Sequence, residues 1–221
     1  MTHFRTVLRT SGLVLALFGG VVQGQSSAQA AAASAPMVTL QMPATPNPVP
    51  VTLNPATTAL LVFDVNDNSC ARPECADVLP TLARFMASAR KAGVVVGYGT
   101  REHNRGHWMP AIAPNPGDIY VENISQDRFY NTDLDQQLKA RGITTLIMAG
   151  VSVNGSVTYT SVGATAHGYT VVVPVDTVVG DGFSRAVGLF QILNQDDRNP
   201  TNEPLKQKAS TLSRTDLITF K

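Results

Sequence analysis

The chain has 221 residues, with 17 Lys or Arg against 16 Asp or Glu, and 43% of its residues are hydrophobic. So nearly neutral a chain has no electrostatic basis for binding nucleic acid or an anionic membrane, which argues against both kinds of partner. Its length is enough for one domain with a single hydrophobic core.

The N-terminus predicts a secretory signal peptide. Arg5 and Arg9 precede an apolar run at 12–22, and the small-residue sequence AQA follows at 28–30. We expect cleavage after Ala30, which would leave 15 basic and 16 acidic residues, a net charge of −1. The apolar run is too short for a comfortable membrane span. We therefore expect an exported protein, periplasmic or secreted, with no stable membrane span after cleavage; a retained N-terminal anchor is the alternative.

The segment after the predicted cleavage site is rich in Ala and Pro. Residues 31–56 are typical of an extended N-terminal arm, partly strand-like at 37–42, and they lead into a domain at 57–221.

The only two cysteines, Cys70 and Cys75, are close in sequence. In an oxidising compartment this pattern predicts one local disulfide. The closed loop is small, so the disulfide would stabilise the fold by roughly 2–3 kcal/mol. We expect its main effect to be on the shape of the loop after the first strand; a free catalytic thiol is the alternative.

From residue 58 onward, strand and helix patterns alternate. Apolar runs followed by polar turns predict strands at 58–65, 94–99, 118–123, 144–150, 169–174 and 216–220, with helices at 77–92, 132–141, 156–167 and 182–194. Strands that are apolar throughout are covered on both faces. The alternation predicts an α/β fold, a three-layer α/β/α sandwich around a doubly wound, mainly parallel sheet. Ligands in such folds bind where the strand order switches direction, at the carboxyl ends of the strands.

Three stretches carry a family resemblance: LLVFDVND, DRFYNTDLDQQLKARGITTLIMAGVSVNGSV and ATAHGYTVVVPVDTVVG. Together they resemble the isochorismatase-like, or cysteine hydrolase, superfamily, from about residue 58 to about residue 194. The resemblance implies a Rossmann-like sandwich, a small-molecule substrate, hydrolase activity without a cofactor, and a homo-oligomer, since relatives are commonly oligomers.

The family's chemistry uses an Asp after the first strand, a Lys after the third and a Cys at the helix after the fourth. Asp64 matches the first position, whereas Asn123 and Ser156 occupy the other two. A serine hydroxyl is a weaker acid than a thiol, and Asn123 brings no charge. We therefore expect a nonstandard catalytic set of Asp64, Asn123 and Ser156, with Asp64 as the acid or base and no Cys nucleophile.

Ser156 has several possible roles. Capping the helix, or holding a carboxylate or oxyanion with the amides at the helix start, is favoured over a role as nucleophile.

Without a neighbouring cation, a buried Asp64 would favour its protonated form, a general acid for enol ether hydrolysis. The alternatives are a catalytically inactive binding protein that keeps the cleft, and a serine hydrolase with an unrecognised base.

Other residues are expected to line the cleft. Arg101, Arg105 and Arg128 are candidates for contacts with a substrate anion, although arginines on loops are more often solvated. Glu102, His103 and His107 follow the second strand, but Gly106 and their spacing indicate a loop, so we predict no metal site. The predicted substrate contacts are Asn66, Arg101, Trp108, Phe129, Val151, Ser152 and Gly155.

Overall fold

The computed structural model describes residues 41, 44–195 and 198–221. The predicted signal peptide and all of the strand-like stretch at 37–42 except Gln41 lie outside the described residues. Each β-strand and helix is given below with its bounds.

The apolar runs form a central parallel sheet in the order β4-β3-β2-β5-β6-β8, with β7 pairing with β5. Every residue of β2 is buried, as its continuous apolar sequence predicts. The strands are β2 (Thr58–Phe63), β3 (Val95–Arg101), β4 (Ile119–Asn123), β5 (Thr145–Val151), β6 (Thr170–Pro174), β7 (Val178–Val179) and β8 (Ser210–Ser213).

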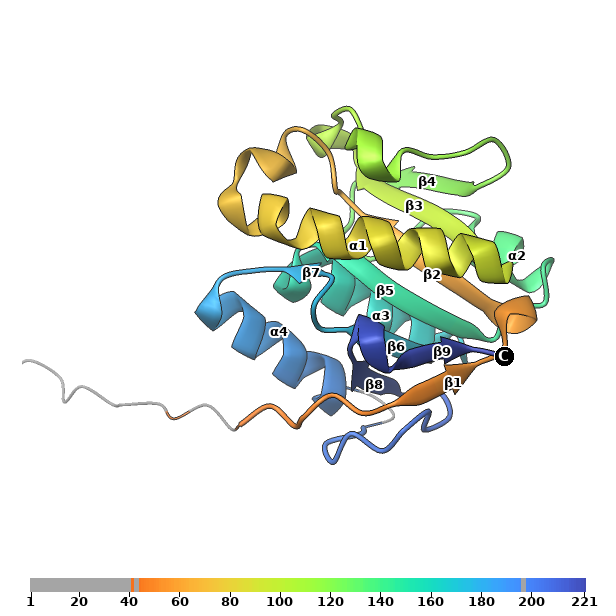
Figure 1. The fold of residues 1–221 in the computed structure, drawn as a ribbon, viewed down its shortest axis with the longest axis vertical. Coiled ribbons are helices and arrows are strands. Elements are labelled where there is room, and N and C mark those ends of the chain that lie inside the picture. The colour runs from red at the N-terminus through yellow and green to blue at the C-terminus, as the bar shows by residue number, and fades with distance from the viewer. Residues whose placement is uncertain (1–40, 42–43, 196–197) are drawn as a thin grey trace, which may run out of the picture. The chain divides into compact units, whose positions relative to one another are not determined.

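Helices cover both faces of this sheet, so the predicted three-layer sandwich is confirmed (Figure 1). Helix α1 (Pro73–Ala92) packs on one face, in a core that includes Leu60 and Val62 of β2. The alternate residues Leu61 and Phe63 face the core under the other helices. These are α2 (Leu134–Lys139), α3 (Thr158–Ala166) and α4 (Gly182–Asn194).

Helix boundaries differ from prediction by a few residues. Helix α1 begins at Pro73, four residues before the predicted start. Proline is tolerated in the first turn because the N–H that it lacks would have no partner within the helix there. Helix α3 begins late, after a π-helical turn at Val153–Val157 in which Gly155 has non-helical torsion angles. The short 3₁₀ helices are Pro55–Thr57, Ser69–Ala71, Glu102–Asn104, Pro110–Ile112 and Thr215–Leu217.

The terminal strand forms, but not in the central sheet. Strand β9 (Ile218–Phe220) pairs in parallel with β1 (Val51–Leu53), which lies inside the predicted arm. One edge of the central sheet is β8 instead, whose sequence STLS has too little apolar character to predict a strand. Val51, Leu53 and Ile218 are buried on the α1 side of the sheet, so this pair contributes to that core.

The strand order switches direction between β2 and β5. The chain leaves β2 through α1 toward β3, and leaves β5 through α3 toward β6 on the opposite side. Gly150, with φ of 109°, lets the two strands approach, since a Cβ there would lie 2.3 Å from the carbonyl oxygen of Phe63. A crevice is therefore expected at the carboxyl ends of β2 and β5.

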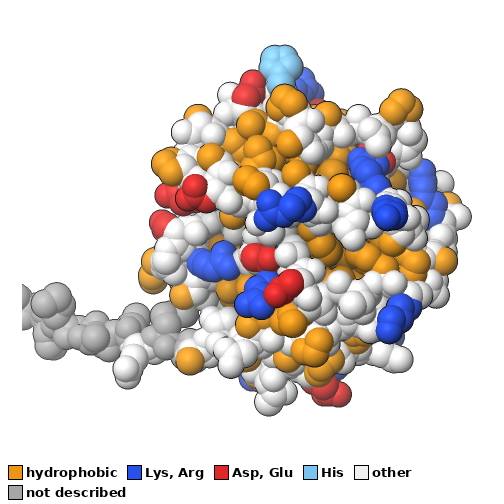
Figure 2. Space-filling view, viewed as in Figure 1, with side chains coloured by type: hydrophobic (Ala, Val, Ile, Leu, Met, Phe, Trp, Pro, Cys, Tyr) orange, Lys and Arg blue, Asp and Glu red, His pale blue; other side chains and the backbone are white. Residues whose placement is uncertain are grey.

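The segment after β2 contains the cysteine pair. The Sγ atoms of Cys70 and Cys75 are 1.94 Å apart and bonded, with Cys75 buried in the first turn of α1. Within the described ranges, no helix has the length and apolarity to cross a bilayer. On the face in Figure 2, acidic and basic side chains are interspersed among apolar ones.

Candidate functional site

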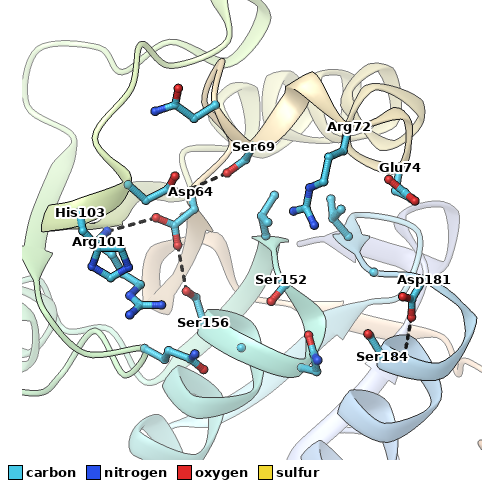
Figure 3. Close-up of a pocket in the computed structure, with 18 residues that line it drawn as sticks. Asp64, Ser69, Arg72, Glu74, Arg101, His103, Ser152, Ser156, Asp181 and Ser184 are labelled. Atoms are coloured by element: carbon cyan, nitrogen blue, oxygen red, sulfur yellow. Dashed lines mark hydrogen bonds between the residues drawn. The ribbon is translucent and has the colours of Figure 1, made fainter.

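A cavity of about 550 Å³ lies at the switch point (Figure 3). Its walls come from the segments after β2 and β3, from the turn between β5 and α3, and from the start of α4. Of the 18 lining residues, only Val151, Gly155, Val179 and Gly180 lack a polar side chain. The cavity therefore suits a polar ligand. Six predicted site residues line it: Asp64, Arg101, Val151, Ser152, Gly155 and Ser156.

Asp64 is held by four hydrogen-bond donors. It follows β2 in the left-handed region, with φ of 52°, a conformation that aspartate tolerates better than most residues. Its Oδ1 accepts from Thr100 Oγ1 and from the main-chain amide of Arg101, each at 3.1 Å. Its Oδ2 accepts from Arg128 Nη2 at 2.6 Å and from Ser156 Oγ at 2.9 Å.

Ser156 takes part in this network and does not cap the helix. Its Oγ donates to Asp64 Oδ2 (Figure 3). The same Oγ accepts from Arg128 Nη2 at 2.9 Å. No side chain caps the first turn of α3, so the expected capping role is wrong. The amides of Gly155 and Val157 both donate to the carbonyl oxygen of Ser152 and are already satisfied.

Arg128 is completely buried, which corrects the expectation that it is solvated. Its Nη1 donates to Asn123 Oδ1 at 3.0 Å and to the carbonyl oxygen of Ser125. Burial lowers the pKa of the Arg128 guanidinium, and the charge of Asp64 raises it. Arginine nevertheless stays protonated in proteins. The sequence led us to expect no cation beside Asp64. This expectation is wrong, because the positively charged guanidinium of Arg128 contacts the Asp64 carboxylate.

Asn123 and Gly99 fix the position of Arg128. Asn123 Nδ2 donates to the carbonyl oxygens of Asp127 and Tyr130 at 2.7 and 2.8 Å, while its Oδ1 holds the guanidinium. A Cβ at Gly99 would lie 2.8 Å from Arg128 Cδ, so the glycine leaves room for the arginine stem. Asn123 is not among the residues that line the cavity.

Three other predicted contacts also lie outside the lining residues. Asn66 is buried and donates from Nδ2 to a main-chain carbonyl of the loop after β3, at 2.7 Å. Trp108 packs edge to face on Tyr98, with ring centroids 4.8 Å apart. Phe129 is buried and stacks on His167 at 4.7 Å. The structure thus places these three in the packing around the site.

The remaining charged candidates are divided between the cavity wall and the surface. His103 lines the cavity, whereas His107 is exposed and lies 3.1 Å from Asp67 Oδ2. Arg105 forms an ion pair with Glu122. Among the residues that the structure describes, no three His, Cys, Asp or Glu side chains gather as metal ligands would.

The model of the isochorismatase domain family matches residues 58–182, more than half of the chain. The chain belongs to the isochorismatase family. A ureidoacrylate amidohydrolase of Methylobacterium radiotolerans is 32% identical over an alignment of 158 residues, and the match covers 48% of this chain and 61% of that relative. The chain thus spans less than two thirds of that relative's length.

Two solved structures share the fold of this isochorismatase-family chain. An isochorismatase family protein of Burkholderia thailandensis is 22% identical, with a TM-score of 0.63 over 77% of this chain and 96% of that one. The N-carbamoylsarcosine amidase of Thermoplasma acidophilum is 21% identical, with a TM-score of 0.60 over 72% and 97%.

Proposed function

We propose that this isochorismatase-family protein hydrolyses a C–N bond of a small polar molecule, using Asp64, Ser156 and Arg128. The observation that carries this proposal is the 2.9 Å hydrogen bond from Ser156 Oγ to Asp64 Oδ2, because both residues line the cavity. A carboxylate at this distance is positioned to accept the serine proton. The names of two relatives, a ureidoacrylate amidohydrolase and an N-carbamoylsarcosine amidase, support an amide or ureido group as the bond cleaved.

In the proposed reaction Asp64 is the acid and base of a site without a cysteine nucleophile. Asp64 Oδ2 takes the proton of Ser156 as Oγ attacks the substrate carbonyl carbon. The C–N bond then breaks, the leaving nitrogen takes the proton from Asp64, and water hydrolyses the acyl ester to restore Ser156. Arg128 Nη2 contacts both Asp64 Oδ2 and Ser156 Oγ, so it stabilises the negative charge as it moves between them.

A second candidate is a binding protein that lacks turnover. The observation that favours it is the full set of four donors on Asp64, since these hydrogen bonds already occupy both carboxylate oxygens, as in a structural network. In that case the cavity would bind the same class of polar metabolite without cleaving it.

Ammonia release from a panel of small amides and ureido compounds distinguishes the two candidates. We expect turnover by the wild type and at least about a 10³-fold loss in Ser156→Ala and in Asp64→Asn. Ser161→Ala is the matched control, because Ser161 is buried in α3 and donates to the carbonyl oxygen of Val157, outside the cavity. Binding without turnover by the wild type would favour the binding protein. Turnover that survives Ser156→Ala would exclude the serine as nucleophile.

A further inference from the structure

Thr100 contacts the proposed catalytic base without reaching the cavity. It lies in β3, is 3% exposed, and is not among the residues that line the cavity. Its Oγ1 donates to Asp64 Oδ1 at 3.1 Å, the only hydrogen bond that this hydroxyl forms among the described residues. Any effect of the Thr100 hydroxyl on the reaction therefore passes through Asp64.

The end of β3 holds Asp64 at three points. The main-chain amide of Asp64 donates to the carbonyl oxygen of Gly99 at 3.1 Å, which continues the pairing of β2 with β3 by one residue. The Thr100 hydroxyl and the Arg101 main-chain amide both donate to Asp64 Oδ1. These three contacts come from consecutive residues of one buried strand. They fix Oδ1 against β3 and leave Oδ2 to accept from Ser156.

The Asp64 carboxylate needs such fixing because its last torsion angle is soft. Rotation about the Cβ–Cγ bond of an aspartate is broad and lacks the sharp minima of a bond between two sp³ atoms. In Figure 3 the carboxylate faces Ser156, and a rotation would change the 2.9 Å distance from Ser156 Oγ to Oδ2. Threonine can prevent this rotation, because its β-branched side chain has few rotamers in a strand and its hydroxyl keeps one direction.

We propose that Thr100 is a positioning residue that orients the Asp64 carboxylate so that Oδ2 accepts the proton of Ser156. This inference rests on the proposed function, since it concerns the same proton transfer. Misplacing a reacting group by about 1 Å can slow an enzyme roughly 10²-fold. Thr100 therefore affects the rate of acylation and leaves substrate binding unchanged, because it does not line the cavity.

Thr100→Val removes the hydroxyl and keeps nearly the same shape. The new methyl group would take the place of Oγ1, 3.1 Å from Asp64 Oδ1. Carbon and oxygen atoms in contact normally stay about 3.3 Å or more apart, so the carboxylate must turn away from β3. Thr100→Ser keeps a hydroxyl at this place. Thr100→Ala removes it without a methyl group against Oδ1, and repeats the test if Thr100→Val does not fold.

Thr211→Val is the matched control. Thr211 is a buried threonine of β8, and its hydroxyl donates to the carbonyl oxygen of Glu203, outside the cavity. Three strands, β2, β5 and β6, separate β8 from β3 in the sheet. Thr211→Val therefore has the same chemical change as Thr100→Val in the same kind of environment, without contact with Asp64.

Two rates test the inference in the full-length protein. One is ammonia release from the best substrate of the amide panel, and the other is labelling of Ser156 by p-nitrophenyl dimethylcarbamate, followed by mass spectrometry. We expect Thr100→Val to lower kcat and the labelling rate about 10- to 100-fold, with KM within about twofold of the wild type. Thr100→Ser should recover most of both rates, and Thr211→Val should retain them. Urea denaturation should show similar losses of stability in the two valine variants.

A third rate does not depend on hydrolysis. In the Ser156→Cys variant, the introduced thiol must lose its proton before iodoacetamide alkylates it. We expect Thr100→Val to slow this alkylation about fivefold or more, because Asp64 no longer faces the thiol. Thr211→Val in the same variant should leave the alkylation rate unchanged.

The outcomes separate this inference from the proposed hydrolysis. Labelling of Ser156 at the same rate in the wild type and in Thr100→Val would overturn the positioning role and leave the hydrolase proposal intact. An equal loss in Thr211→Val, a raised KM with unchanged kcat, or no recovery in Thr100→Ser would also overturn it. A wild type that is neither active nor labelled would reject hydrolysis. In that case a Thr100-dependent alkylation rate would retain the orientation of Asp64 by Thr100, and an independent rate would overturn it.

Discussion

The guanidinium of Arg128 lies against the carboxylate of Asp64, with Nη2 2.6 Å from Oδ2 and side-chain exposures of 0% and 4%. The two residues are 64 positions apart, one after β4 and the other at the end of β2. Their pairing joins the loop after the edge strand to the switch point. The cost of burying the two charges is offset only while both partners of the pair are present.

Removing Arg128 should therefore destabilise the fold. We expect Arg128→Met to lower the free energy of unfolding by about 3–5 kcal/mol, because it leaves the Asp64 carboxylate buried and unpaired. In urea denaturation, Asp64→Asn combined with Arg128→Met should cost clearly less than the sum of the single changes. The exposed Arg105 is the control, and Arg105→Gln should have no measurable effect. Additive losses would show that the two charges do not depend on each other.

Gly99 should be required for the position of Arg128. A methyl group there would meet the Arg128 stem, so we expect Gly99→Ala to cost about 1–3 kcal/mol and to lower kcat. In Gly182→Ala the new methyl group would meet no atom within 4 Å, which makes it the matched control. Unfolding and steady-state kinetics measure both variants. Wild-type kcat in Gly99→Ala would mean that the guanidinium does not need this placement.

Replacing Ser156 by cysteine should increase the reactivity of the site. A thiol loses its proton more easily than a hydroxyl, so Ser156→Cys should hydrolyse amides about tenfold faster or more. Iodoacetamide should inactivate this variant and leave the wild type unaffected, because Cys70 and Cys75 are bonded to each other. Mass spectrometry locates the modified residue. A variant that is neither alkylated nor active would indicate that ligands do not reach the Ser156 position.

The fold could be predicted from the sequence because its signals are local. Continuous apolar strands such as β2 and β5 indicate burial on both faces, and their alternation with helices indicates the parallel sheet. Strand β8 was not predicted, because the sequence STLS has no local strand pattern. It forms a strand by pairing with β6.

The arrangement of the candidate site could be predicted only in part. The positions of Asp64 and Ser156 follow from the ends of two neighbouring strands, whereas the burial of Arg128 depends on contacts distant in sequence. Two sequence features could have indicated the burial of Arg128. The arginine lies between strand β4 and the aromatic Phe129, and the small Gly99 lies on the adjacent strand β3.

The disulfide should matter for both stability and the cavity. Reduction of Cys70–Cys75 should lower the free energy of unfolding by roughly 2–3 kcal/mol. Ser69, Arg72 and Glu74 of the same segment line the cavity, so reduction should also weaken ligand binding. Urea denaturation and calorimetry with and without a reductant measure the two effects. Equal affinity in both states would show that the disulfide does not shape the cavity wall.

We propose that the protein is exported and that residues 1–30 are removed. The arginines and apolar run before AQA at 28–30 support this proposal, as does the cysteine pair at bonding distance. N-terminal sequencing of the protein from its native host should begin at Ala31. A start at Met1 in a cytoplasmic fraction would contradict export, and an intact N-terminus in the membrane fraction would indicate a retained anchor.

Trapping the acyl-enzyme tests the central claim most directly. The wild type, Asp64→Asn and Ser156→Ala are mixed with an activated carbamate ester, quenched in acid and examined by intact-protein and peptide mass spectrometry. We predict a single carbamoyl group on Ser156 in the wild type and none in either variant. No adduct in the wild type, or an adduct on another residue, would contradict the role of Ser156 as nucleophile with Asp64 as its base.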